Sequence, residues 1–198
     1  MSLYLRELQH LIRDEKKTIS STKLGRLLGL KDGQVRKDLA YFGQFGYPGI
    51  GYRCEELVEE IRRILGTDRV WPTAMVGVGN LGQALLGYRG FRSQGFDVVA
   101  AFDVDERVVG TEIGGLKVYH LDELREIVQK KAIQLAILAV PADAAPVVAE
   151  VIVNSGINGV LNFAPVTLSL PKSVSVVGVD LAMELEQLAF AVVSKTEK

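Results

Sequence analysis

The chain has 198 residues, of which 48% are apolar and 24% charged, so it can bury a sizeable core and differs from chains that stay disordered. It contains no run of about 18 uncharged apolar residues, which excludes a membrane-spanning helix. The charged N-terminus is unlike a secretion signal, and we expect a cytoplasmic protein with no membrane partner. The single cysteine, Cys54, excludes an internal disulfide, and the two histidines provide no His/Cys metal site.

Charge is divided unevenly along the chain. Residues 1–52 hold nine Lys/Arg and five Asp/Glu, a net charge of +4, whereas residues 53–198 hold 14 and 19, a net charge of −5. A basic N-terminal segment suits a polyanion such as DNA, although a solvated surface of mixed charge explains it equally well. The order of the residues has to decide between these two interpretations.

Three short helices are predicted in the first 43 residues. Apolar residues recur at helical spacing over residues 5–12 and again over residues 24–28, where the pattern is preceded by N-cap candidates and followed by Gly29. A third helix is predicted over Asp32–Phe42. Its buried stripe would consist of Val35, Leu39 and Phe42.

The opposite face of this third helix suggests a function. At about 100° per residue, it carries Gln34, Lys37, Ala40 and Tyr41, with Arg36 on its flank. A helix, a short turn and a second helix resemble a helix-turn-helix, whose second helix enters the major groove, where Gln, Lys or Arg reads base edges. The alternative is that Lys37 and Arg36 only solvate a helix and that Tyr41 packs at the edge of the core.

A hairpin is predicted next. Residues 44–52 hold three glycines, a proline and interleaved aromatic residues, which is typical of the wing of a winged helix. A last helix, Glu55–Leu65, would then complete a winged-helix DNA-binding domain over residues 1–68. The candidate DNA contacts are Ser21, Gln34, Arg36, Lys37, Tyr41 and Tyr47.

Residues 69–180 alternate strand-like and helical patterns, which indicates an α/β domain with a parallel sheet covered by helices. The strand Thr73–Val76 runs into Gly77-Val78-Gly79-Asn80-Leu81-Gly82, a G-x-G-x-x-G pattern, and the strand Phe96–Phe102 leads into Asp103. Such glycines allow a tight turn, close approach of a pyrophosphate and close helix packing, and the helix N-terminus attracts the anion. We therefore predict a Rossmann-type dinucleotide-binding domain.

Asp103 follows Gly82 by 21 positions. Its carboxylate can accept hydrogen bonds from the adenosine ribose and would repel a 2′-phosphate, so NADH and NAD+ are favoured over their phosphorylated forms. The alternatives are a glycine turn without a ligand and a strand-end cap. Two later predicted strands, over residues 134–140 and 159–161, add candidates at their ends, because ligands of such sheets lie beyond the carboxyl ends of the strands, although ordinary loop turns explain them as well. The cofactor-binding candidates are Gly77, Gly79, Asn80, Leu81, Gly82, Asp103, Val140, Pro141, Asn162 and Phe163.

The last segment, residues 181–198, begins after Asp180, a possible N-cap, and is apolar on most sides. A helix of this kind needs cover on more than one side, so it would bury against a partner subunit in a homodimer. Packing on its own domain is the alternative.

Taken together, the segment Gln34–Gly43, the Gly49–Tyr52 wing, the glycine turn and Asp103 resemble the Rex family of redox-sensing transcriptional repressors over nearly the whole chain. The resemblance implies a winged helix, an NAD(H)-binding Rossmann domain and a C-terminal helix exchanged in a homodimer. It further implies binding to a palindromic double-stranded DNA operator, which NADH releases and NAD+ leaves bound.

The resemblance also assigns roles to single residues. Arg36 and Lys37 match the recognition-helix positions of the family, and Pro48 stands where many members carry a basic wing residue, which implies a weaker minor-groove contact. The dinucleotide positions of the family match Gly77, Gly79, Gly82 and Asp103. Its switch contacts would fall on Arg6, Tyr88 and Asp180.

An NAD-dependent dehydrogenase with an added N-terminal module is the rival hypothesis, because a Rossmann fold alone does not determine function. Such an enzyme needs a proton donor near the nicotinamide, and His120 stands in no recognisable catalytic pattern. We therefore expect no enzyme and no catalytic residue. A DNA-binding protein that senses nothing is the third possibility.

Overall fold

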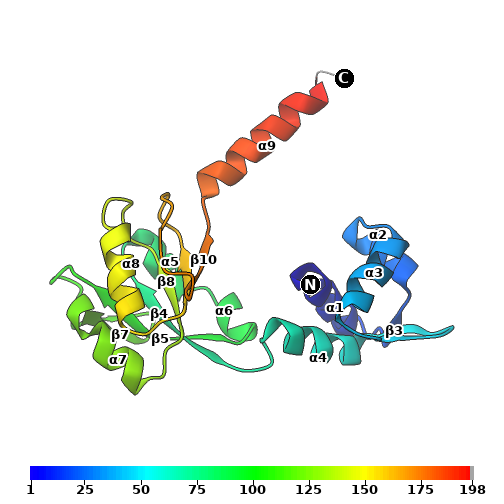
Figure 1. Ribbon diagram of the computed structural model, residues 1–198, viewed down its shortest axis with the longest axis horizontal. Helices are drawn as coiled ribbons and strands as arrows, with labels where there is room; N and C mark the ends of the chain where they lie inside the picture. The colour runs from blue at the N-terminus through cyan, green and yellow to red at the C-terminus, as the bar shows by residue number, and fades with distance from the viewer. Residues whose placement is uncertain (197–198) are drawn as a thin grey trace. The chain divides into compact units, whose positions relative to one another are not determined.

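The computed structural model describes residues 1–196, and the chain divides into two compact units, Met1–Arg69 and Val70–Lys198 (Figure 1). The boundary lies one residue beyond the end of the predicted N-terminal domain, residues 1–68. The last two positions of the predicted C-terminal segment, residues 197–198, lie outside the described residues.

The first unit consists of four helices and a small sheet around one core. Leu8, Leu24, Val35, Leu39 and Ile61 are buried together at its centre, because each helix turns an apolar face inward. The elements are α1 (Ser2–Arg13), β1 (Thr18–Ile19), α2 (Ser21–Leu28), α3 (Asp32–Phe42), β2 (Gly46–Tyr47), β3 (Gly51–Arg53) and α4 (Cys54–Leu65).

The turn between α2 and α3 follows from local sequence. The Ser20 side chain caps α2 by accepting a hydrogen bond from the backbone N–H of Lys23 at 3.2 Å, and Gly29 ends the helix in a left-handed conformation with φ of 68°. A Cβ atom on Gly25 would lie 2.6 Å from the carbonyl oxygen of Leu30, so the turn folds tightly back on α2. This packing holds α2 and α3 in the predicted helix-turn-helix order.

One prediction for α3 is wrong. Phe42 does not complete the buried stripe, because α3 ends at Gly43 and the Phe42 side chain is 43% exposed. Its ring lies edge-on to that of Tyr41, with 4.9 Å between the ring centroids. Tyr41 is itself 84% exposed and does not pack at the edge of the core. The buried stripe consists of Val35 and Leu39.

The small sheet has the order β1-β3-β2, and all its pairs are antiparallel. Strands β2 and β3 form the predicted hairpin. Strand β1, which the sequence did not indicate, pairs with β3 on the other side, with Ile19 opposite Tyr52. A Cβ atom on Gly51 would lie 2.4 Å from the carbonyl oxygen of Ile19, so only glycine allows this approach.

The second unit is built on a seven-stranded sheet of order β10-β9-β8-β4-β5-β7-β6, parallel except where β6 joins β7. Strands β4, β5, β8 and β9 coincide with predicted runs, whereas β6, β7 and β10 were not predicted. The elements are β4 (Trp71–Val76), α5 (Asn80–Leu86), α6 (Gly90–Ser93), β5 (Phe96–Asp103), β6 (Glu112–Ile113), β7 (Leu116–His120), the 3₁₀ turn η1 (Leu121–Glu123), α7 (Leu124–Lys130), β8 (Leu135–Leu138), α8 (Ala145–Asn154), β9 (Gly159–Asn162), β10 (Ser175–Gly178) and α9 (Leu181–Thr196).

Helices cover the two faces of the sheet to different extents. On one face α7 and α8 bury Leu124 and Ile152 against Phe102 and Leu138. On the other face α5 and α6 pack on a second cluster that contains Met75. Beyond α6 on this second face lies an almost wholly apolar hollow of about 370 Å³, lined over β8, β9 and β10 by Leu135, Ile137, Leu161 and Val177 among others.

Helix α9 ends the described chain, and its apolar side chains are exposed: Leu188 is 60% and Phe190 75% accessible. The alternative that this helix packs on its own domain therefore does not hold in the structure. Among residues 1–196, no helix is both long and apolar enough to cross a membrane.

Candidate functional site

A cavity of about 470 Å³ opens at the carboxyl ends of β4, β5 and β8. The three strands lie side by side in the sheet, so the loops that follow them meet at one edge. The predicted residues that line the cavity are Gly77, Gly79, Asp103, Val140 and Pro141.

The glycines of the turn after β4 differ in what surrounds them. Gly77 has φ of 90°, and a Cβ atom there would lie 2.5 Å from the carbonyl oxygen of Ala139. A Cβ atom on Gly82 would lie 2.0 Å from the carbonyl oxygen of Gly77. At Gly79 it would meet no heavy atom of the described residues within 4 Å. Gly77 and Gly82 therefore keep the turn tight, while Gly79 keeps space open beside the cavity.

Asp103 is held firmly at the end of β5. Its carboxylate accepts hydrogen bonds from the backbone N–H groups of Val78 and Val104, both at 2.7 Å, and of Asp105 at 3.0 Å. The strand-end cap expected as an alternative is therefore present. Because a carboxylate offers about four acceptor positions, a hydroxyl donor from a ligand can still be accommodated.

A second carboxylate lines the same cavity. Asp105 accepts hydrogen bonds from the Arg107 guanidinium, with Oδ2 2.6 Å from Nη2, and this arginine lowers the pKa of Asp105 to about 2. Both Asp105 and Asp103 face the space after β5 as hydrogen-bond acceptors. The Arg107 guanidinium balances the charge of Asp105, so Asp103 is the carboxylate that a 2′-phosphate would meet, whereas a ribose diol would find acceptors.

The other predicted cofactor residues lie elsewhere. Asn80 and Leu81 are exposed at the start of α5, and Gly82 is buried beneath the turn. Asn162 is buried, and its amide holds its own loop: Nδ2 donates to the carbonyl oxygens of Ala164 and Val166 at 3.1 and 2.9 Å, and Oδ1 accepts from the N–H of Ala164. Phe163 packs into the cluster under α5 and α6.

Sequence reasoning missed the apolar part of this cavity. Part of its lining consists of apolar side chains that suit the flat, apolar faces of an adenine ring. A signal for them existed, because they follow Asp103 directly or lie at the start of the elements after His120 and Pro141. These residues are Val104, Val108, Leu121, Ala144 and Val148.

The first unit presents its predicted contacts on α3. Tyr41 and Lys37 lie on the outward face, as the helical spacing predicts. Arg36 is drawn toward α2, because its Nη1 donates to Ser21 Oγ at 3.1 Å and to Asp32 Oδ2 at 2.8 Å. This contact brings Ser21 and Arg36 together at one end of the face.

The wing is fastened to α4. The Tyr47 hydroxyl donates to Glu56 Oε2 at 2.9 Å, and the guanidinium of Arg53 lies 4.6 Å from the centroid of the Tyr47 ring. Hydrogen bonds from Arg53 and Tyr47 lower the pKa of Glu56. Arg53 thus places a positive charge at the base of the wing, which sequence reasoning did not single out, while Pro48 lies in the turn between β2 and β3.

The residues assigned to a switch are spread over both units. Arg6 is exposed on α1 in the first unit. Asp180 in the second unit caps α9, because its Oδ1 accepts from the N–H groups of Ala182 and Met183 at 2.9 and 3.2 Å. Tyr88 is 60% exposed, with its ring edge-on to Phe91 at 5.1 Å.

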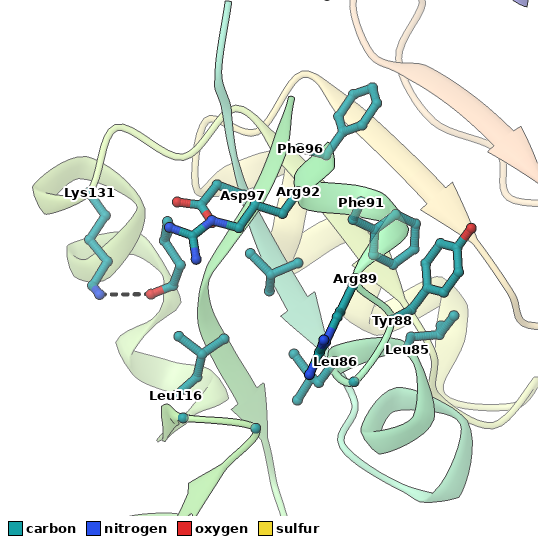
Figure 2. A pocket seen from close by; sticks show the side chains of 15 residues that line it. Leu85, Leu86, Tyr88, Arg89, Phe91, Arg92, Phe96, Asp97, Leu116 and Lys131 are labelled. Carbon is teal, nitrogen blue, oxygen red and sulfur yellow. Dashed lines mark hydrogen bonds and ion pairs between the residues drawn. The ribbon is translucent and has the colours of Figure 1, made fainter. Parts of the chain in front are cut away.

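Tyr88 also lines a second cavity, of about 470 Å³, at the amino end of β5 (Figure 2). Figure 2 shows the Tyr88 hydroxyl directed away from Lys131, which lies on the far side of the cavity. Lys131 Nζ donates to the carbonyl oxygen of Val99 at 2.7 Å, and Arg92 Nε lies 3.8 Å from Asp97 Oδ1. Two of the cations at this cavity are therefore already engaged with acceptors of the protein.

Comparison with known proteins identifies the family. Residues 68–166 match the family described as "CoA binding domain", and residues 1–40 match that described as "Putative DNA-binding protein N-terminus". The redox-sensing transcriptional repressor Rex of Syntrophobacter fumaroxidans is 44% identical over 191 residues, which cover 96% of this chain and 91% of that protein. Rex of Chloroflexus aurantiacus is 41% identical over 197 residues, which cover 100% and 93%. The chain belongs to the Rex family.

Solved Rex structures share its fold. The crystal structure of RSP in complex with beta-NAD+ and operator DNA matches with a TM-score of 0.93 at 33% identity, over 98% of this chain and 90% of that one. The structure of RSP with beta-NADH matches with a TM-score of 0.88 at 32% identity, over 98% and 91%. The predicted family and fold class are confirmed, and because the full-length relatives are repressors, this Rex chain is not a dehydrogenase.

Proposed function

We propose that this Rex chain is a DNA-binding transcriptional repressor that senses the NADH/NAD+ ratio and leaves a palindromic operator when NADH binds. One observation carries the proposal: a single chain holds both the cavity between Gly79 and Asp103 and a helix-turn-helix with a wing. Its likeness to RSP, solved with NAD+ and operator DNA, supports the same pair of ligands here.

The nucleotide binds in the second unit, where residues 69–180 form an NAD(H)-binding domain. The pyrophosphate lies over Gly77 and Gly79, where the backbone is open, beside the turn formed by Asn80, Leu81 and Gly82. Asp103 accepts hydrogen bonds from the adenosine ribose, and the apolar wall around Val104 covers the adenine. Beyond the pyrophosphate, the loop after β8 supplies Val140 and Pro141 toward the nicotinamide, while Asn162 and Phe163 hold the loop after β9 in place.

The DNA binds to the first unit, residues 1–68, with α3 in the major groove. Lys37 and Tyr41 reach outward from α3, while Arg36 and Ser21 form a polar pair at its flank. Tyr47 and Arg53 make the contact of the wing with the DNA backbone, because the wing position of Pro48 holds no basic side chain.

A homodimer brings two such units to one operator. The exposed apolar side chains of α9 support an exchange of residues 181–198 between subunits. Leu188 and Phe190 are exposed to water, and covering them with a partner subunit lowers the free energy. Arg6, Tyr88 and Asp180 relay the state of the nucleotide to the DNA-binding units. The two α3 helices then meet half-sites about one helical turn, or a multiple of it, apart. The protein acts in the cytoplasm, where NADH and DNA are both present.

The test is a titration of fluorescently labelled operator, selected from random DNA by the protein itself, followed by anisotropy. NADH should raise the Kd for DNA, whereas NAD+ should leave it nearly unchanged and NADPH should act only at much higher concentration. CoA serves as a further competitor, since the matching domain family is described by that ligand. By thermodynamic linkage, saturating DNA must weaken NADH binding by the same factor by which NADH weakens DNA binding. Equal NADH affinity with and without operator rejects the proposal.

A further inference from the structure

A carboxylate stands among the outward side chains of α3. Asp38 lies four residues after Gln34, about 40° further round the helix, so the two share the face that also carries Lys37 and Tyr41. The Nε2 group of Gln34 donates a hydrogen bond to Asp38 Oδ1. A negative charge among residues that meet DNA is unfavourable by itself, so its presence calls for a role.

The second oxygen of Asp38 connects α3 to the core. Asp38 Oδ2 accepts a hydrogen bond from the hydroxyl of Tyr4 at 2.8 Å, and Tyr4 on α1 is only 4% exposed. Burial and the neighbouring Asp38 carboxylate raise the pKa of Tyr4, so its hydroxyl keeps its proton and remains a donor. The Asp38 side chain is therefore fixed between a buried hydroxyl and an outward amide.

This arrangement determines which way the Gln34 amide faces. A carboxylate only accepts hydrogen bonds, so the nitrogen end of the amide must face Asp38, and the remaining N–H and Oε1 are left to face outward. Without that anchor the two ends of the amide exchange places by rotation about the last side-chain bond. An adenine presents a donor at N6 and an acceptor at N7 in the major groove, which an oriented amide matches.

We infer that Asp38 is a positioning residue that sets which base Gln34 reads, and that this base is an adenine in each half-site of the operator. The inference rests on the proposed function, because it takes α3 to lie in the major groove. The contact that sets the amide orientation is the one between Asp38 Oδ1 and Gln34, whereas Tyr4 only binds the other oxygen of Asp38.

The experiment selects bound sequences from a random duplex library and compares the enriched motifs. The wild-type protein should enrich a palindromic motif, and Gln34→Ala should lose the preference for adenine at one position of each half-site. Asp38→Ala should lose about tenfold of the preference at that same position, within the range that a bidentate base contact provides. Tyr4→Phe is the matched control, because it removes the tie to α1 and leaves the Gln34–Asp38 contact intact, so its motif should remain that of the wild type.

Asp38→Ala leaves the buried Tyr4 hydroxyl without its acceptor, which lowers stability. The double variant Tyr4→Phe/Asp38→Ala removes that hydroxyl as well and is compared with Tyr4→Phe alone, after thermal unfolding has shown that both fold. The inference is overturned if Asp38→Ala in either background keeps the wild-type motif, if it alters a position other than the one Gln34→Ala alters, or if Gln34→Ala changes no position. A wild-type protein that enriches no motif would instead reject the proposed function itself.

Discussion

Two glycines of one turn place different demands on the chain. A methyl group on Gly82 would lie 2.0 Å from the Gly77 carbonyl oxygen, whereas one on Gly79 would meet open space among the described residues. Gly82→Ala should therefore lower the free energy of unfolding by about 1–3 kcal/mol, as overpacking does. Gly79→Ala should unfold at the wild-type temperature but bind NADH at least about tenfold more weakly, because its methyl group takes room that the pyrophosphate needs.

Thermal unfolding and NADH fluorescence titration of the two variants separate these effects. A Gly79→Ala protein that binds NADH as tightly as the wild type would show that the pyrophosphate lies elsewhere.

Asp103 offers a second test at the scale of one residue. Asp103→Asn replaces one acceptor oxygen by an N–H₂ group beside three backbone N–H donors, and it removes the negative charge. We expect the free energy of NADH binding to weaken by about 1–3 kcal/mol, or roughly fivefold to 150-fold in Kd, and the preference for NADH over NADPH to shrink. Titrations with both nucleotides measure the change.

Asp97→Asn is the control for this variant, since Asp97 lies at the other end of the same strand, next to Arg92. If Asp97→Asn weakens NADH binding as much as Asp103→Asn does, the effect comes from charge in general and not from a ribose contact.

At the scale of elements, α9 makes the clearest prediction. Leu188 and Phe190 are exposed in the single chain, so Leu188→Glu and Phe190→Glu should leave its fold intact. In a dimer that buries both side chains, the introduced charges would be desolvated, at a cost of several kcal/mol. We expect these variants to be monomeric in light scattering after size-exclusion chromatography and to lose operator binding. Glu184→Gln on the same helix should remain dimeric, and dimeric Phe190→Glu protein would contradict the proposed exchange.

The elements that were predicted from sequence are those with strong internal patterns. Strands β4, β5, β8 and β9 are runs of apolar residues in the centre of the sheet, where both faces are covered over much of their length. Strands β6 and β10 lie at the two edges, where a strand can be short and polar, and all four residues of β10 are exposed. Strand β1 has two residues and exists only because β3 lies beside it. Strands that depend on a neighbouring strand in this way show no hydrophobic periodicity in the sequence.

In the candidate sites too, residues with a local sequence pattern could be predicted, whereas those that depend on tertiary packing could not. Gly77, Gly79 and Asp103 were found because their spacing is local and their chemistry specific, and they meet at one cavity. The role of Asn162 could not be predicted, since its amide is used up by a loop whose path depends on tertiary packing. Asp38 could have been found, because the helical spacing that placed Gln34 outward places Asp38 beside it.

At the scale of the whole molecule, the two units have separate cores. The fluorescence of one residue reports on the unfolding of one unit only. Trp71, the single tryptophan of the sequence, begins β4 in the second unit. NAD+ at about 100 times its Kd should stabilise that unit by about 2.7 kcal/mol and raise the urea midpoint seen by tryptophan fluorescence. Hydrogen exchange of the buried amides of α1 and α4 should not respond to NAD+. An equal gain in both places would mean that the units unfold as one block.

The narrow approach of Gly51 to Ile19 has a consequence for how a signal can act on DNA. It ties the wing to β1, the short strand between α1 and α2, while Tyr4 and Asp38 tie α1 to α3, so the wing and α3 belong to one rigid domain. A nucleotide bound in the other unit therefore cannot reshape this domain. It can change only the distance between the two identical DNA-binding domains of the proposed dimer, so release from the operator follows when their spacing no longer matches that of the half-sites.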